Sequence, residues 1–172
     1  MKKIKVLLFI TASFILWSCS STQTTEGGDS GNTDAKNRGV IAEGAKGCVT
    51  GDCTNGKGVY VYENGDRYEG EFKDGRRSGE GVFQYANGDS FAGSYDNDVR
   101  NGRGVYIFKN GDRYEGDFKN GEREGKGVYT FHDGKVYDGE FIKDGQSGKG
   151  NFKESGKQLN CELNGRRVLC NE

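Results

Sequence analysis

The sequence predicts an all-β protein, a single-layer, elongated antiparallel array of β-hairpin repeats. The four segments between the recurring glycines align without insertion or deletion, and these glycines stand 23 residues apart at Gly58, Gly81, Gly104, Gly127 and Gly150. Each segment holds two short runs of β-branched and aromatic residues around an Asn-Gly or Asp-Gly pair, which is a strong hairpin signal. Repetition at one fixed period indicates stacked identical units.

Residues 1–18 have the layout of a secretory signal peptide. A basic start precedes the apolar run from Val6 to Trp17, which is shorter than the roughly 20 residues that a transmembrane helix needs. The run ends in Leu16-Trp17-Ser18-Cys19, which resembles the lipobox of bacterial lipoproteins, although Trp17 is bulkier than the usual residue there. This resemblance implies that Cys19 carries lipid, such as palmitate. The alternative is that Cys19 is an ordinary thiol of the leader.

Lipid on Cys19 would anchor the protein to a bacterial membrane at the cell envelope. We expect the outer membrane or the cell surface rather than the inner membrane. Residues 19–46 are polar and glycine-rich, without an aromatic residue, and hold too few apolar side chains to offset the entropy of ordering. They are expected to form a flexible tether with a mean reach on the order of 30 Å.

The repeats and their caps occupy the remainder of the sequence. Residues 58–150 hold four 23-residue repeats, residues 47–57 read as an N-terminal capping half-repeat, and residues 151–172 as a degenerate C-terminal capping repeat. Caps are expected because each unit of a repeat array buries its apolar face only against a neighbour.

The alternation of aromatic residues selects the turn type. A two-residue type I′ turn would mix aromatic and charged residues on each face, since a shift of one residue exchanges the faces of a strand. A type I turn with Gly65 as the bulge residue instead places Tyr60 opposite Tyr68, and we expect this turn. The opposite face is then mostly charged, and the candidate binding face consists of Tyr60, Tyr62, Tyr68, Phe72, Phe83, Tyr85, Phe91, Tyr95, Tyr106, Phe108, Tyr114, Phe118, Tyr129, Phe131, Tyr137 and Phe141.

The unit resembles the membrane occupation and recognition nexus (MORN) repeat. The match is clearest at Tyr68-Glu69-Gly70-Glu71-Phe72 and at Tyr114-Glu115-Gly116-Asp117-Phe118. The resemblance implies an open hairpin array. It also implies a link to membranes, because MORN repeats have been connected with phospholipid binding.

Four cysteines flank the repeats, and outside the cytoplasm an even set of four indicates two disulfides. About eight strands at roughly 4.8 Å spacing separate the N-terminal pair from the C-terminal pair by close to 40 Å, too far for a bond between the ends. We therefore expect Cys48–Cys53 and Cys161–Cys170. The same separation argues against a four-cysteine metal site, and no metal or other cofactor is expected.

Catalysis is not expected either. The single histidine, His132, stands where sister repeats place Glu63, Ala86 and Lys109, and we interpret it as a solvated turn residue. The recurring pair Glu69 and Glu71 is interpreted as partners of Lys and Arg rather than as a general acid and base. The acidic turns lack the ligand spacing of a calcium loop.

The main expected role of the candidate binding face is to stabilise the one-layer sheet. Its exposed part marks a partner site, because contiguous exposed apolar surface usually does so. The first hypothesis is a non-enzymatic protein-interaction or scaffold module that binds an unknown envelope protein. The alternatives are carbohydrate or envelope-polymer binding, and phospholipid binding. Nucleic acid is excluded as a partner, since the charges alternate in sign along the chain and form no basic stripe.

Overall fold

The computed structural model describes residues 44–164 and 167–171. The predicted signal peptide, Cys19 and residues 19–43 of the predicted tether lie outside this part of the chain. Within the described residues, no helix is long and apolar enough to cross a membrane.

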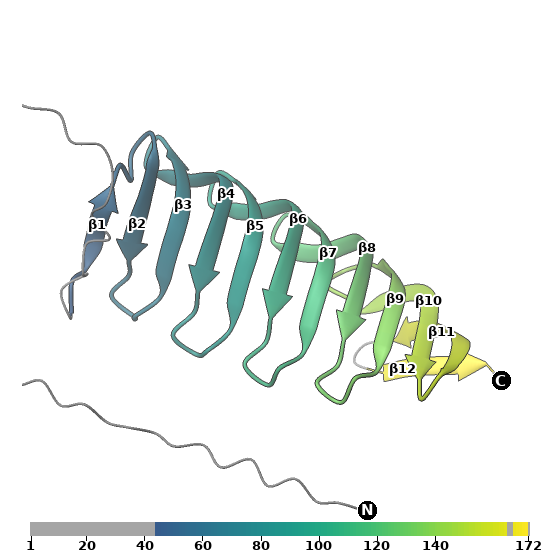
Figure 1. Cartoon of the computed structure of the whole chain (residues 1–172). Helices are drawn as coiled ribbons and strands as arrows, with labels where there is room; N and C mark the ends of the chain where they lie inside the picture. Colours follow the sequence, from purple (N-terminus) through teal and green to yellow (C-terminus); the bar gives the residue numbers. More distant parts are fainter. Residues whose placement is uncertain (1–43, 165–166, 172) are drawn as a thin grey trace, which may run out of the picture. The chain divides into compact units, whose positions relative to one another are not determined.

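The described residues form one antiparallel sheet in which every strand pairs with its neighbours in sequence (Figure 1). This confirms the predicted all-β array of consecutive hairpins. The twelve strands are β1 (Gly47–Gly51), β2 (Lys57–Val61), β3 (Arg67–Lys73), β4 (Arg76–Gln84), β5 (Ser90–Asp96), β6 (Val99–Ile107), β7 (Arg113–Lys119), β8 (Glu122–Thr130), β9 (Val136–Phe141), β10 (Ser147–Glu154), β11 (Lys157–Asn164) and β12 (Arg167–Asn171).

The hairpin turns have the expected bulged geometry. Tyr60 lies opposite Tyr68 in the ladder between β2 and β3. The Gly65 N–H donates to the Tyr62 carbonyl at 3.0 Å, and Gly65 has a φ of 89°, which places it in the left-handed region that glycine adopts without strain. A type I turn followed by a left-handed residue that forms a bulge is the common three-residue hairpin loop.

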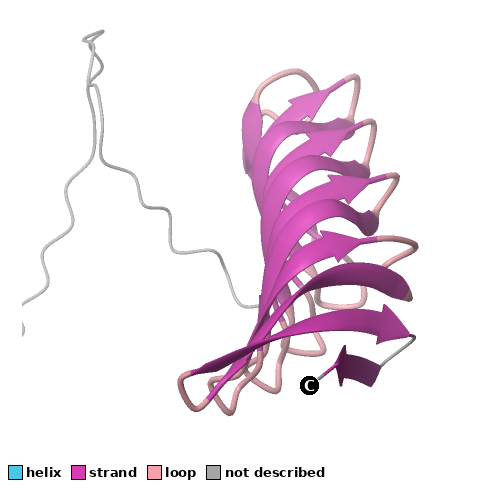
Figure 2. Ribbon diagram, turned by 90° about the vertical axis from the view of Figure 1, so that its right-hand side faces the viewer, coloured by secondary structure: helices cyan, strands magenta, loops and turns pink. Residues whose placement is uncertain are grey.

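The sheet is bent, which the sequence analysis did not predict. The pairing register shifts between Gly70 and Phe72, between Gly93 and Tyr95, and at the same place in the next repeat. Bulges of this kind increase the local twist and bend the strands. The long strands therefore arch along their length, and the sheet forms a trough (Figure 2).

The trough encloses a core, although the described residues form only one layer. Tyr68, Phe91, Tyr114 and Tyr137 occupy the same position in successive repeats and are at most 1% exposed. We call these four residues the buried row. The Tyr68 ring meets Phe72 edge to face, with centroids 5.1 Å apart, and its hydroxyl donates to the Glu71 carbonyl at 3.1 Å. An aromatic interior thus forms where the bent sheet folds over its own rings.

The opposite face carries ion pairs and also apolar side chains. Glu69 and Glu71 were expected to pair with basic side chains of a neighbouring strand. Lys57 and Glu71 do so across β2 and β3, at 3.5 Å, whereas Glu69 pairs with Arg67 of its own strand, at 2.6 Å. Apolar residues such as Ile107, which is 45% exposed, interrupt the expected charged surface.

Both ends of the array carry a disulfide. Cys48 is bonded to Cys53, and Cys161 to Cys170, which are the two pairs expected from the sequence. Cys161 is buried and belongs to the aromatic core, so the C-terminal disulfide closes the end of the trough. The N-terminal disulfide lies at the edge strand β1, where unpaired backbone groups would otherwise invite pairing with another chain.

Candidate binding groove

The structure divides the predicted binding face into a buried part and an accessible part. Nine of its sixteen residues are buried, including the buried row, and these rings stabilise the trough. The other seven are partly exposed and line the open side of the trough: Tyr60, Tyr62, Tyr85, Tyr106, Phe108, Tyr129 and Phe131.

These seven rings belong to a continuous row of nine aromatic rings, joined by eight contacts, that we call the aromatic ladder. Consecutive centroids lie between 4.5 and 6.1 Å apart, within the range of favourable aromatic pairs, in the order Tyr60, Tyr62, Phe83, Tyr85, Tyr106, Phe108, Tyr129, Phe131 and Phe152. Phe152 was missed in the sequence analysis. Its signal was its place 23 residues after Tyr129, inside the decayed last repeat.

A row of three arginines lies against the rings, and the sequence analysis missed it as well. Arg77, Arg100 and Arg123 each place their guanidinium carbon 5.0–5.9 Å from the centroids of three aromatic rings. Contacts of this length between a guanidinium and a ring face are attractive. The available signal was again the 23-residue spacing, which the fourth repeat breaks with Gln146.

Two of these arginines are held by a carboxylate from the next repeat. Arg77 Nε donates to Asp98 Oδ1 at 3.0 Å, and Arg123 Nε donates to Asp144 Oδ1 at 2.8 Å. Partial burial raises the pKa of Asp144, but the hydrogen bond and charge of Arg123 outweigh it, so the net pKa is lowered. The Asp144 carboxylate therefore stays ionised, and each of the two carboxylates holds its arginine over the rings.

Aspartates at the hairpin turns accept hydrogen bonds from tyrosines of the aromatic ladder. Tyr106 donates its hydroxyl proton to Asp89 Oδ2, and Tyr129 to Asp112 Oδ2, both at 2.8 Å. The second oxygen of Asp112 accepts the backbone N–H of His132 at 2.8 Å. Burial raises the pKa of Asp112, but these hydrogen bonds dominate and lower it to about 2. Each aspartate thus joins one turn to the next repeat.

His132 lies in its turn with 62% of its side chain exposed, as interpreted from the sequence, yet it is not free. Its Nδ1 lies 2.9 Å from Asp112 Oδ1. Between residues 44 and 164 and in the short last strand, no cluster of three or more His, Cys, Asp or Glu side chains is arranged to hold a metal ion.

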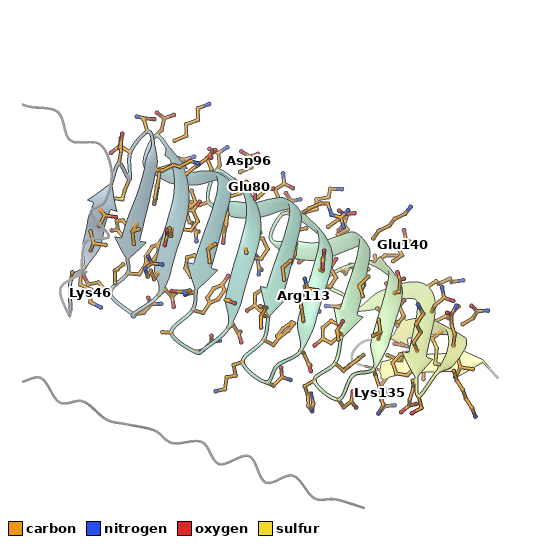
Figure 3. The ribbon with its side chains drawn as sticks, in the orientation of Figure 1. Lys46, Glu80, Asp96, Arg113, Lys135 and Glu140 are labelled. Atoms are coloured by element: carbon orange, nitrogen blue, oxygen red, sulfur yellow. A yellow bond between two sulfur atoms is a disulfide. The ribbon has the colours of Figure 1, made fainter. Side chains whose placement is uncertain are left out.

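A cavity of about 830 Å³ lies at the C-terminal end of the groove. Its lining combines ladder rings such as Phe108 and Tyr129 with charged groups such as Asp112 and Arg123. Leu163 and Val168 from the last hairpin close one side. Further charged side chains project from the margins of the sheet, among them Glu80, Asp96, Lys135 and Glu140 (Figure 3).

The sheet and its groove define a class of protein, a repeat protein whose candidate binding surface is assembled from the same positions of successive hairpins. The repeat unit is similar to the MORN repeat, whose family model matches four consecutive segments: residues 54–67, 68–90, 91–113 and 114–136. The resemblance expected from the sequence is thus confirmed for the repeat unit. MORN repeats are in general non-enzymatic and serve in interactions. Among curated proteins, none matches the chain.

Proposed function

We propose that this protein is a lipid-anchored, non-enzymatic interaction or scaffold module of the bacterial cell envelope, which binds a protein partner in its aromatic groove. The observation that carries the proposal is the aromatic ladder. It runs through every repeat, and eight of its nine rings remain partly exposed, although other aromatic rings already fill the interior of the sheet.

The chemistry of the groove suits a protein partner. Tyr and Arg are the residues most enriched at the centres of protein interfaces, because they combine a large contact area with a polar group. The ladder and the arginine row place both types side by side. The rings are also preorganised, since Asp89 and Asp112 hold the hydroxyls of Tyr106 and Tyr129, and a fixed ring loses little further entropy on binding.

Charge also favours a protein over an anionic membrane as the occupant of the groove. Asp89, Asp112 and Asp144 line the 830 Å³ cavity together with Lys109 and Arg123. A surface for anionic phospholipid would instead need an excess of basic groups. The mixed signs match the mixed side chains of a folded protein.

The proposed anchor is lipid on Cys19, supported by the lipobox-like sequence that ends the leader. A chain attached in this way needs no membrane-binding face, and the polar residues that follow would hold the repeats clear of the bilayer. Incorporation of labelled palmitate into the wild type and into Cys19→Ala tests this point. We expect label and membrane association only in the wild type, and equal labelling of both proteins would refute the anchor.

Capture of partners from envelope extract by the full chain tests the groove. Phe108→Ala removes a ladder ring, and Ile107→Ala, its neighbour on the opposite face, serves as the matched control. We expect Phe108→Ala to weaken capture at least tenfold and Ile107→Ala to leave it unchanged. Equal capture by all three proteins would refute the proposal. Binding of glycans or liposomes that depends on Phe108 would replace the protein partner with one of the two alternatives.

A further inference from the structure

Two arginines of the row pair with an aspartate of the next repeat, and the arginine between them does not. Arg77 of the first repeat donates two N–H groups to Asp98 Oδ1 of the second, the backbone N–H at 2.9 Å and Nε at 3.0 Å. Arg123 of the third repeat donates the same two groups to Asp144 Oδ1 of the fourth, at 3.2 and 2.8 Å. For Arg100 of the second repeat, the corresponding residue in the third is Gly121, which has no side chain.

Arg100 nevertheless keeps the pose of its two sister arginines. Its Nη2 donates to the Gly121 carbonyl at 2.6 Å, as the Nη2 groups of the other two do to the carbonyls of their aspartates. Its guanidinium carbon lies 5.3–5.5 Å from three ring centroids. The Nε–H and the backbone N–H of Arg100 therefore stand where the sister arginines hold a carboxylate oxygen, but the oxygen itself is missing.

The space next to Arg100 is open. A cavity of about 130 Å³ adjoins its side chain, with walls from Tyr106, Phe108 and Phe118. At Gly121 itself, a side-chain carbon would meet only Val99, at 3.8 Å. A carboxylate from outside the chain thus has room to reach both donors.

The charge of Arg100 is compensated only at longer range. Arg123 and Asp144 also line the cavity. Asp144 feels the charge of Arg100, but its ion pair, at 2.8 Å, is with Arg123. Of the described residues, none with a carboxylate lies within ion-pair distance of Arg100. A guanidinium that is partly desolvated against rings gains from a charged hydrogen bond more than an exposed one does.

We propose that Arg100 is a recognition site for a carboxylate, an Asp or Glu side chain that the protein partner inserts into the aromatic groove. This inference rests on the proposed function and adds the chemistry of the contact. The partner's oxygen takes the place that Asp98 and Asp144 fill from within the chain. The absent side chain at Gly121 thereby converts a structural ion pair into a binding site in the middle of the ladder.

The test uses NMR of the ¹⁵N-labelled full chain, with the Nε–H signals of the arginines as probes. Acetyl-glutamate N-methylamide models the partner's side chain, and the glutamine analogue is the neutral control. We expect the glutamate compound to shift the Arg100 signal saturably at millimolar concentrations, and the glutamine compound to shift it at least tenfold less. Arg100→Gln identifies the signal.

Two matched variants make the test specific. Gly121→Asp supplies the missing carboxylate, and its backbone suits aspartate, since Asp98 and Asp144 have φ values of 70° and 56° where Gly121 has 85°. We expect this variant to abolish the response of Arg100. The reciprocal change, Asp98→Gly, should create a new saturable response at Arg77. An unchanged response at Arg100 in Gly121→Asp, or no saturable shift in the wild type, would overturn the inference.

The outcome of the NMR titration is independent of partner capture, because the glutamate compound binds without a partner protein. A wild type that captures a protein through Phe108 but shows no saturable shift overturns this inference alone. A saturable shift without any capture overturns the proposed function alone. Where both succeed, Gly121→Asp must also weaken capture at least tenfold, and equal capture would overturn the assignment of the carboxylate to the partner.

Discussion

The ring of Tyr68 lies flat in the space that a side chain at Gly81 would occupy. Gly81 pairs with Gly70 across β3 and β4, and a β-carbon on Gly81 would lie within 2.5 Å of the Tyr68 ring. The same relationship joins Phe91 to Gly104 and Tyr114 to Gly127. The glycine period seen in the sequence is thus a steric requirement of the buried row.

Gly81→Ala should therefore destabilise the protein by about 1–3 kcal/mol, the usual cost of overpacking an interior. Gly75→Ala is the control, because a β-carbon there meets nothing within 4 Å, although φ is 74°. The control should lose about 1 kcal/mol through backbone strain alone. Urea denaturation measures both values. Gly81 has no positive φ, so a Gly81→Ala variant that loses no more than the control would show that contact with the Tyr68 ring does not select glycine at this position.

Replacing Asp112, which accepts a hydrogen bond from Tyr129, should destabilise the protein more than replacing its counterpart in the first repeat. Asp112 accepts the Tyr129 hydroxyl, whereas Asp66 has Phe83 in that place and only the backbone N–H of Ala86 from the next turn. Asp112→Ala should cost about 1–3 kcal/mol, because it leaves the hydroxyl without its partner.

Asp66→Ala is the matched control for Asp112→Ala. It should cost less by at least about 1 kcal/mol, the value of the tyrosine hydrogen bond, because Asp112 also contacts His132 Nδ1 at 2.9 Å. Thermal unfolding of the two variants side by side measures the difference. If the two variants are equally stable, the tyrosine–aspartate bonds do not hold the ladder.

Alkaline titration should distinguish the buried tyrosines Tyr68 and Tyr114 from exposed ones. Burial, opposed in part by the nearby Arg77 and Arg123, raises the pKa of Tyr68 and of Tyr114 to about 12. A raised pKa in the folded state means that stability is complete below the ordinary value near 10 and is lost as pH rises toward 12, by about 1.4 kcal/mol per unit of pKa shift for each ring.

The absorbance of phenolate at 295 nm, recorded together with circular dichroism, tests this expectation. A late fraction of the phenolate signal should appear only as the β signal disappears. Complete ionisation of all tyrosines near pH 10 with the sheet intact would contradict the burial of these rings.

The C-terminal disulfide should stabilise only the strands close to it. Replacing both Cys161 and Cys170 by Ala opens a bond between residues 9 apart, which removes about 2–3 kcal/mol by the chain-entropy model. Because each repeat contacts only its neighbours, hydrogen exchange should quicken in β11 and β12 and stay unchanged in β5 and β6. Uniformly faster exchange along the whole sheet would show that the array unfolds as one unit.

The sequence was sufficient for the fold because its signals are local. The Asn-Gly turns with Gly65 at the bulge, the facing of Tyr60 and Tyr68, and the 23-residue period all act within one hairpin or between adjacent ones. The disulfide partners followed from the order of strands alone. These features needed no knowledge of how distant residues pack.

The bend of the sheet and the arginine row depend on packing between repeats, and this made them harder to predict. The shift between Gly70 and Phe72 folds the sheet over its rings, which decides that Tyr68 is buried while Tyr62 stays accessible. The spacing of Arg77, Arg100 and Arg123 was visible in the sequence. Only the structure shows that each guanidinium lies on rings and that Gly121 leaves one of them without its carboxylate.

Photo-cross-linking in living cells tests most directly whether the aromatic side of the sheet binds a protein partner. Benzoylphenylalanine replaces either Phe108 in the groove or Ile107 on the opposite face, two adjacent residues whose side chains point to opposite sides of the sheet. We predict a discrete cross-linked protein from position 108 and none from position 107. A partner captured from position 107 and not from position 108 would contradict a binding groove on the aromatic side.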